Sequence, residues 1–232
     1  MDPKKRDPLL AAVCHDLRAP LAAVTMGANF VLQTTERDAA NARSVKILEA
    51  MLRSCTQMER LIRNFGDLSA IEADTVELRR GAHDVGAMLE RAADDAKERG
   101  AAKSVKVEVT KPAAPIALAC DHDRLVRALG HLLDNAIEAA PRESSVALSA
   151  VARGDSLAFT VVDRGEGPSE DVREHLFDRS WLTQRAGRVG AAFGLAIARG
   201  FARAHGGDLA LTSAPGEATT FTLEIATASE AQ

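Results

Sequence analysis

Two stripes of apolar residues, each repeating at helical spacing, run through the N-terminal part of the chain. The first extends from Leu10 to Val31 and the second from Val45 to Leu68, in steps of three and four residues. Such spacing predicts two amphipathic helices, and the polar stretch 33–41 between them predicts a turn. Two helices cannot enclose their own apolar stripes. We therefore expect an antiparallel hairpin that pairs with a second copy into a homodimeric four-helix bundle.

The remainder of the chain mixes helical and strand periodicity. A charged stretch at 74–84 predicts a linker. Helical spacing predicts helices over 85–99, 121–140 and 193–205. Alternating or β-branched runs predict strands over 105–109, 116–119, 146–151, 157–162, 208–212 and 219–225. This order predicts two domains, a helical hairpin over residues 1–74 and an α/β two-layer sandwich over residues 82–228.

Composition narrows the expected partners and compartment. Hydrophobic residues make up 46% of the chain and aromatic residues 3%, so the core must be aliphatic and base-stacking platforms are scarce. A net charge of −4 with interspersed signs argues against a nucleic-acid surface. Three scattered cysteines without a C-x-x-C pair predict neither a disulfide framework nor a zinc site, which fits a cytoplasmic location. No apolar run approaches the ~18 residues of a membrane span, so we expect none in this chain.

His15 is the first candidate for chemistry. With Leu17 and Val24 at heptad position a, His15 falls at position f, far from the predicted seam and among small alanines. An imidazole in such a place is accessible to a bulky substrate. Asp16 can orient the ring and accept its proton, and Pro20 bends the helix nearby. We therefore expect His15 to act as a nucleophile with Asp16 as its assisting carboxylate.

A second group of candidates lies in the C-terminal part. On the predicted helix 121–140, Asn135 shares a polar face with His131, and an amide oxygen is a suitable ligand for Mg²⁺. Asp163 continues the inward-facing row of the predicted strand 157–162. A buried carboxylate needs a hydrogen-bond donor, so we expect Asp163 to bind one from a ligand.

Glycines follow at two places where the backbone can approach a ligand. Gly165 and Gly167 permit a sharp turn directly after the strand. The Gly- and Ala-rich stretch 190–195 opens the last predicted helix, whose first amide groups suit a phosphate. Within this stretch we single out Gly190, Gly194 and Leu195. Arg185 and Arg188, in the preceding loop, are cationic candidates for the same phosphates.

In this order, the motifs resemble those of the sensor histidine kinase core of two-component signalling. The residues C-H-D-L-R-A-P-L from Cys14 are similar to the family's H-box, and H-L-L-D-N-A from His131 is similar to its N-box. D-R-G-E-G from Asp163 resembles the G1 box, and F-D and W-L within 177–182 resemble the F-box region. G-A-A-F-G-L from Gly190 resembles the G2 box. The resemblance extends over nearly the whole chain.

This resemblance implies a fold and a set of roles. The implied fold is a dimeric helical hairpin followed by a Bergerat-type ATP-binding sandwich, with ATP and Mg²⁺ as cofactors. His15 would be phosphorylated with the help of Asp16, Asn135 would bind Mg²⁺, and Asp163 would read adenine. The phosphoryl group would then pass to an aspartate in the receiver domain of a response regulator. A separate sensor protein or input domain would supply the signal.

The chain departs from the family pattern at several positions. Ala19 stands where many members have a Thr or Asn that positions water for dephosphorylation of the regulator. His131 replaces the first Asn of the N-box, and Glu138 replaces a basic residue. Ala192 and Ala218 replace glycines, and their methyl groups would restrict the approach of the backbone to phosphates.

Two other functions remain open from the sequence. A histidine phosphotransferase would keep the dimer and His15 but carry a degenerate ATP domain, which the replaced family residues favour. An ATP-gated scaffold or chaperone-like ATPase would hydrolyse ATP without forming a phosphohistidine, and the H-box argues against it. Incubation with γ-labelled ATP separates the three, because only a kinase acquires an acid-labile, base-stable label.

Overall fold

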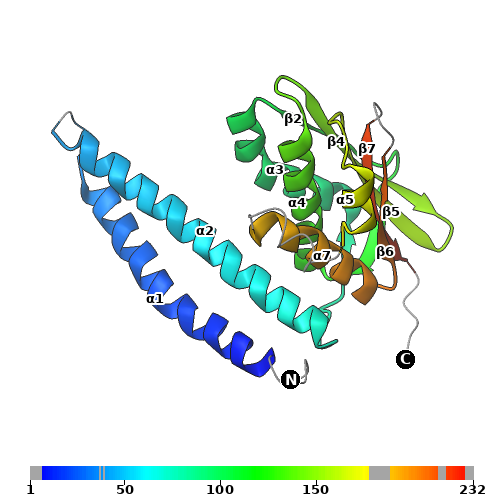
Figure 1. Ribbon diagram of the computed structural model, residues 1–232, viewed down its shortest axis with the longest axis horizontal. Coiled ribbons are helices and arrows are strands. Elements are labelled where there is room, and N and C mark those ends of the chain that lie inside the picture. Colours follow the sequence, from blue (N-terminus) through cyan, green and yellow to red (C-terminus); the bar gives the residue numbers. More distant parts are fainter. Residues whose placement is uncertain (1–6, 37, 39, 178–188, 214–217, 228–232) are drawn as a thin grey trace. The chain divides into compact units, whose positions relative to one another are not determined.

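The computed structural model divides the chain into two compact units, Met1–Thr75 and Val76–Gln232. The N-terminal unit is helical, and the C-terminal unit is a sheet packed with helices (Figure 1). The residues that the structure describes are 7–36, 38, 40–177, 189–213 and 218–227. Among these residues, no helix combines the length and the hydropathy needed to cross a bilayer.

The N-terminal unit is a hairpin of two long helices, α1 (Asp7–Thr34) and α2 (Ala42–Glu72), as the two apolar stripes predict (Figure 1). Asp38 stabilises the turn, because its Oδ1 accepts a hydrogen bond of 2.8 Å from the backbone N–H of Asn41. Apolar side chains spaced along both helices form the interior of the hairpin. They are Cys14, Leu21, Ala28, Val45, Cys55 and Leu68.

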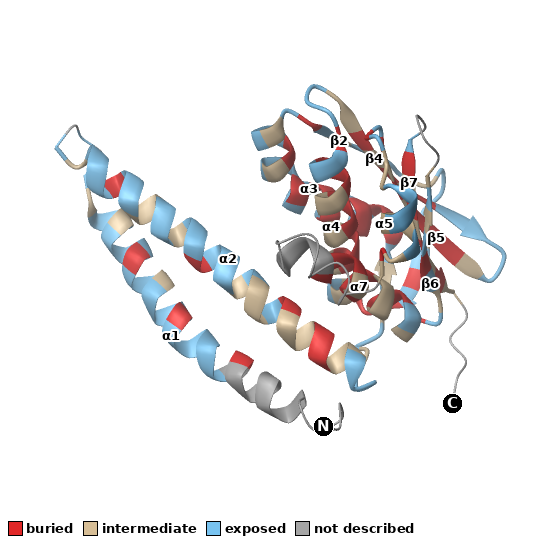
Figure 2. Cartoon of the chain, viewed as in Figure 1, coloured by how far each residue is buried: buried red, intermediate tan, exposed pale blue. Residues whose placement is uncertain are grey.

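A second apolar stripe on each helix is exposed in the single chain, and Figure 2 shows exposed surface along both helices. Its members are Leu17, Val24 and Val31 on α1, and Ile47, Met51 and Met58 on α2. The three α1 residues are 48%, 48% and 46% exposed, and they belong to the heptad seam that the sequence predicts. The hairpin therefore buries one side of α1 and leaves an adjacent apolar side uncovered.

The C-terminal unit is built on a five-stranded sheet with the order β2–β4–β5–β7–β6. Its strands are β2 (Lys106–Thr110), β4 (Ser145–Arg153), β5 (Ser156–Asp163), β6 (Asp208–Thr212) and β7 (Thr219–Ala226). β2 runs parallel to β4, and all the other neighbours are antiparallel. Buried residues alternate along β7 and along the first part of β4, so one face of the sheet carries the core.

In the described part of the unit, three helices pack against this sheet (Figure 1). They are α3 (Val85–Lys103), α4 (His122–Ala139) and α7 (Val189–Ala204). α4 contacts both α3 and α7 and completely buries Leu125, Leu129 and Leu132. Each such leucine stabilises the fold by roughly 2 kcal/mol relative to an exposed one. A further short helix, α5 (Glu170–Glu174), follows the turn after β5.

The segment predicted as a linker also contains a strand. β1 (Gly81–Asp84) pairs antiparallel with β3 (Ala117–Cys120) in a separate two-stranded sheet. Asp84 then caps α3, because its Oδ1 accepts a hydrogen bond of 2.7 Å from the N–H of Ala87. A run of four residues is too short to display a strand period, and the pairing partner lies far along the chain. The charged sequence therefore predicted only a linker at this place.

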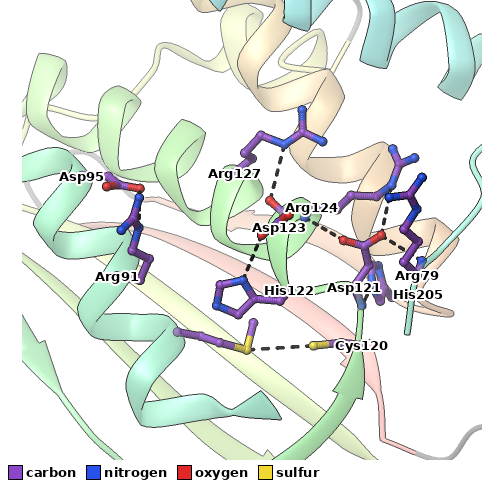
Figure 3. Close-up of polar contacts among 11 residues, drawn as sticks. Arg79, Arg91, Asp95, Cys120, Asp121, His122, Asp123, Arg124, Arg127 and His205 are labelled. Atoms are coloured by element: carbon purple, nitrogen blue, oxygen red, sulfur yellow. Dashed lines mark hydrogen bonds and ion pairs between the residues drawn. The ribbon is translucent and has the colours of Figure 1, made fainter. Parts of the chain in front are cut away.

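A polar cluster fixes the N-terminus of α4 (Figure 3). Asp121 caps the helix: its Oδ1 accepts from the N–H of Arg124 at 3.1 Å, and its Oδ2 accepts from the N–H of Arg79 at 3.0 Å. The N–H of Asp121 donates to Nε2 of the buried His205 at 3.0 Å. The ring therefore carries its hydrogen on Nδ1, which lies 2.7 Å from the carbonyl oxygen of Phe201. The cluster ties α4 to the segment before β1 and to the end of α7.

Acid should destabilise the C-terminal unit through His205. Burial lowers the pKa of this imidazole, while the carbonyl of Phe201 acts in the opposite direction. Folding thus favours the neutral ring. This stabilisation is complete above the ordinary pKa of 6.5 and is lost as the pH falls through the lower folded value. Between about pH 7 and about pH 5, the melting temperature should fall more steeply for the wild type than for His205→Asn.

Thermal unfolding followed by circular dichroism at each pH measures this difference. His175→Asn, which changes an imidazole just after α5, is the control and should keep the wild-type dependence. Parallel pH dependences for the wild type and His205→Asn would show that His205 does not contribute to it.

Candidate functional site

His15 and Asp16 lie in α1, within the N-terminal unit. The preceding Cys14 is buried, and residues 16–20 are all exposed. This part of α1 therefore turns one side toward the interior of the hairpin and the other toward solvent. Pro20 stands inside the helix, where it removes one backbone hydrogen bond. The surface formed by residues 16–20, directly after His15, is therefore accessible to a large substrate.

Asp163 is the last residue of β5 and is completely buried. Its Oδ1 accepts a hydrogen bond of 2.8 Å from the backbone N–H of Gly165. Its Oδ2 is the one buried polar side-chain atom in the described part of the chain that has no hydrogen-bond partner. Burial raises the pKa of this carboxyl, while the N–H of Gly165 and the charge of Lys103 act in the opposite direction. A ligand that donates to Oδ2 would satisfy the orphaned oxygen.

The two glycines after Asp163 allow close approach of the backbone. Gly167 has a φ of +71°, a left-handed conformation that favours glycine. A Cβ at this position would also collide with the hydroxyl of Ser213. A Cβ at Gly165 would lie 2.7 Å from the carbonyl oxygen of Ala139, at the end of α4. The turn therefore packs tightly between α4 and the segment that follows β6.

Asn135 and His131 lie one turn apart on α4. The Nδ2 of Asn135 donates a hydrogen bond of 2.9 Å to the carbonyl oxygen of His131, which leaves Oδ1 as the atom able to ligate a cation. The ring of His131 lies against α7, since a Cβ at Gly194 would be 3.1 Å from its Nδ1. α4 thus contacts both glycine motifs, Gly194 through His131 and Gly165 through Ala139.

The Gly-rich stretch forms the start of α7. The helix begins at Val189, earlier than the apolar periodicity predicts, and Gly190 lies in its first turn. Leu195 is 4% exposed and attaches the helix to the core. The first turn of a helix has backbone N–H groups without helical acceptors, which suits a phosphate. Arg185 and Arg188 lie outside the described residues.

Sequence reasoning missed the polar contacts around Thr219. This first residue of β7 pairs with Asp163 across the sheet and is 2% exposed. Its hydroxyl lies 3.4 Å from that of Ser213, whose carbonyl oxygen accepts a hydrogen bond of 2.8 Å from Arg173. Strand alternation places Thr219 on the same face as the apolar Phe221. That inward position was the signal available in the sequence.

Asn135 suits a magnesium ion that is shared with a phosphate ligand. Among the described residues, no group of three or more His, Cys, Asp or Glu is arranged to hold a metal ion. Mg²⁺ does not require such a group, because it commonly takes one or two protein ligands and completes its shell with water and phosphate oxygens. An amide oxygen on α4 beside the start of α7 fits this pattern.

Two protein families match the chain. Residues 5–74 match the His Kinase A (phospho-acceptor) domain. Residues 120–229 match the histidine kinase-, DNA gyrase B- and HSP90-like ATPase. The first match contains His15, and the second contains Asn135 and Asp163.

The chain is also similar to individual sensor kinases. It is 31% identical over 225 residues to the sensor protein DivL of Caulobacter vibrioides, covering 95% of this chain and 28% of DivL. It is 27% identical over 219 residues to the histidine protein kinase DivJ of the same organism, covering 93% of this chain and 36% of DivJ. The chain thus spans little more than a third of DivJ and less of DivL.

A solved structure extends this similarity to the fold. In the crystal structure of full-length ShkA in complex with AMPPNP, 46% of that chain aligns with 96% of this one. The TM-score is 0.75 and the sequence identity is 25%. The order of hairpin and sandwich is therefore shared as well as the local motifs. The chain is thus a sensor histidine kinase core, with a phosphoacceptor hairpin followed by an ATPase sandwich.

Proposed function

We propose that this chain is an ATP-dependent, autophosphorylating protein-histidine kinase that relays a phosphoryl group from His15 to an aspartate of a response regulator. The observation that carries the proposal is the buried Oδ2 of Asp163, which has no partner in the protein. The exocyclic amino group of adenine is a donor of the right chemistry for this oxygen. The match of this region to the ATPase family supports the same ligand.

The remaining site residues bind the rest of the nucleotide. The glycines at 165 and 167 keep the turn beside the base free of side chains, and Leu195 holds α7 in place. The backbone N–H groups at the start of α7, around Gly190, bind the phosphates. Gly194 lets α7 pack closely against His131, which fixes the position of this helix start. Asn135 holds the Mg²⁺ ion, which neutralises phosphate charge when bound. Arg185 and Arg188 complete the phosphate contacts.

Phosphorylation requires one nucleophile and one proton acceptor. The unprotonated ring nitrogen of His15 attacks the γ-phosphorus of ATP. A P–N bond forms, the bond from the γ-phosphorus to the bridging oxygen breaks, and ADP leaves with the electron pair. Asp16 accepts the proton of the other ring nitrogen. The P–N bond then delivers its phosphoryl group to the carboxylate of a receiver domain.

The two activities, phosphotransfer and nucleotide binding, belong to different domains. We assign dimerisation and phosphotransfer to residues 1–74 and nucleotide binding to residues 82–228, in a protein that works in the cytoplasm. A separate sensor protein or input domain supplies the signal. Ala19 offers no hydroxyl or amide to position water, so we do not propose that this chain dephosphorylates the regulator.

A histidine phosphotransferase is the alternative. Glu138 occupies the last turn of α4, where family members carry a basic residue, and Ala192 and Ala218 stand in place of glycines. These changes weaken nucleotide binding without affecting the hairpin. The retained Asp163 and Asn135 favour the kinase, and the binding of ATP decides between the two functions.

The proposed homodimer should depend on the exposed apolar stripe of the hairpin. Leu17→Asp places a charge at a residue that is 48% exposed in the single chain and buried in a dimer, so the monomer should form. Light scattering should give a dimeric mass for the wild type and a monomeric mass for this variant. Met26→Glu is the control, because Met26 is 69% exposed and lies about 180° around α1 from Leu17. A monomeric wild type would refute the dimer.

Incubation with γ-labelled ATP should label His15 and no other residue. His15→Gln should abolish the acid-labile, base-stable label while leaving ATP binding and dimer mass unchanged, because the change removes only the nucleophile. The same substitution at His175 should keep the full label. Persistence of the label on His15→Gln would assign the phosphoacceptor elsewhere.

Asp163→Asn should eliminate measurable ATP binding. The NH₂ group of the asparagine can face the adenine amino group, and two donors form no hydrogen bond. Its oxygen is also a neutral acceptor, which binds more weakly than a carboxylate. Asp155→Asn makes the same chemical change at an exposed turn residue and should keep wild-type affinity. Isothermal calorimetry measures both variants. If the wild type itself binds no ATP at millimolar nucleotide, the phosphotransferase function replaces the kinase.

A further inference from the structure

The C-terminus of α4 lacks a cation of its own. Its last turn contains no basic residue and includes the acidic Glu138. The C-terminal end of a helix is the negative end of its macrodipole, and its last carbonyl groups have no donors within the helix. The negative charge of Glu138 beside the negative end of the helix is unfavourable. A positive donor from another part of the chain would stabilise this end of the helix.

Lys103, in the last turn of α3, is that donor. Its Nζ donates a hydrogen bond of 2.9 Å to the carbonyl oxygen of Ile137 and a second hydrogen bond to that of Glu138. A second tie joins the same two helices, because the guanidinium of Arg99 on α3 binds the carboxylate of Asp134 on α4. The final turn of α4 is thus fastened to α3 by side chains.

This final turn lies directly against the turn that holds the buried carboxylate. The next carbonyl, that of Ala139, is in such close contact with Gly165 that a Cβ there would lie 2.7 Å away. The N–H of Gly165 in turn binds Oδ1 of Asp163. The charge of Lys103 also opposes the effect of burial on the pKa of Asp163. A continuous series of contacts therefore leads from Lys103 to Asp163.

We propose that Lys103 is a positioning residue for adenine recognition: it fastens the end of α4 against Gly165 and thereby aims the Asp163 carboxylate at the adenine amino group. The inference rests on the proposed function, in which Asp163 accepts a hydrogen bond from adenine. Lys103 itself binds backbone carbonyls and does not contact the nucleotide. Its effect should therefore depend on the presence of the amino group.

Two nucleotides that differ only in this group test the proposal. ATP is compared with purine riboside triphosphate, which has hydrogen in place of the 6-amino group, by calorimetry on the full chain. In Lys103→Met, affinity for ATP should fall about tenfold, the scale of one hydrogen bond to a charged group. Affinity for the analogue should stay within about twofold, so the preference for ATP should nearly disappear. Lys103→Arg keeps the charge and the donors and should restore the preference.

Lys97→Met is the matched control. Lys97 is on the same helix and loses the same charge, but it pairs with the exposed Asp94. This variant should bind both nucleotides like the wild type. Circular dichroism on every variant checks that the C-terminal unit is folded.

A double-mutant comparison identifies the route of the effect. Asp163→Asn alone should leave no measurable ATP binding, so the analogue is the ligand compared here: adding Lys103→Met to this variant should leave its affinity for the analogue unchanged. Equal weakening of both nucleotides in Lys103→Met, or an unchanged preference, would overturn the proposal and leave the kinase function intact. A wild type that binds both nucleotides equally would instead refute the recognition of the adenine amino group by Asp163. It would refute the proposed role of Lys103 as well.

Discussion

A single buried carboxylate imposes the main constraint on the C-terminal unit. Asp163 is completely buried at the end of the central strand, where an ionised group needs donors on both of its oxygens. The chain supplies one donor, the N–H of Gly165, and leaves Oδ2 without one. With this one donor, the unit is less stable than a core with both oxygens satisfied would be. A ligand with an amino group removes that deficit, which links the stability of the unit to nucleotide binding.

The helix α4 connects the surroundings of this carboxylate with the rest of the sandwich. Its apolar side is buried between α3 and α7, and its other side carries Asn135 and His131. Both ends of the helix are held by groups distant in sequence, the N-terminus by Arg79 and His205 and the C-terminus by Lys103. A helix fixed at both ends and along one side keeps its polar face in a constant position, as a nucleotide site requires.

The hairpin follows a different physical rule. Two helices can bury only the stripe that lies between them, and here that stripe includes Cys14, Leu21 and Ala28. Leu17, Val24 and Val31 are left about half exposed at the surface of the single chain. Exposed apolar residues at heptad spacing are typical of a surface that a partner helix covers. In the proposed homodimer, a second copy of the chain covers this side of α1.

Local pattern alone determined the two helices of the hairpin, the main strands of the sheet and the ordered motifs around His15, Asn135 and Asp163. Periodicity and motif spacing depend on neighbouring residues, so the sequence displays them directly. Only the tertiary structure decided the pairing of β1 with β3, the parallel alignment of β2 with β4, and the bonds from Lys103 to the end of α4. Those contacts join residues far apart in the chain, where the sequence contains the groups but no signal for which groups will meet.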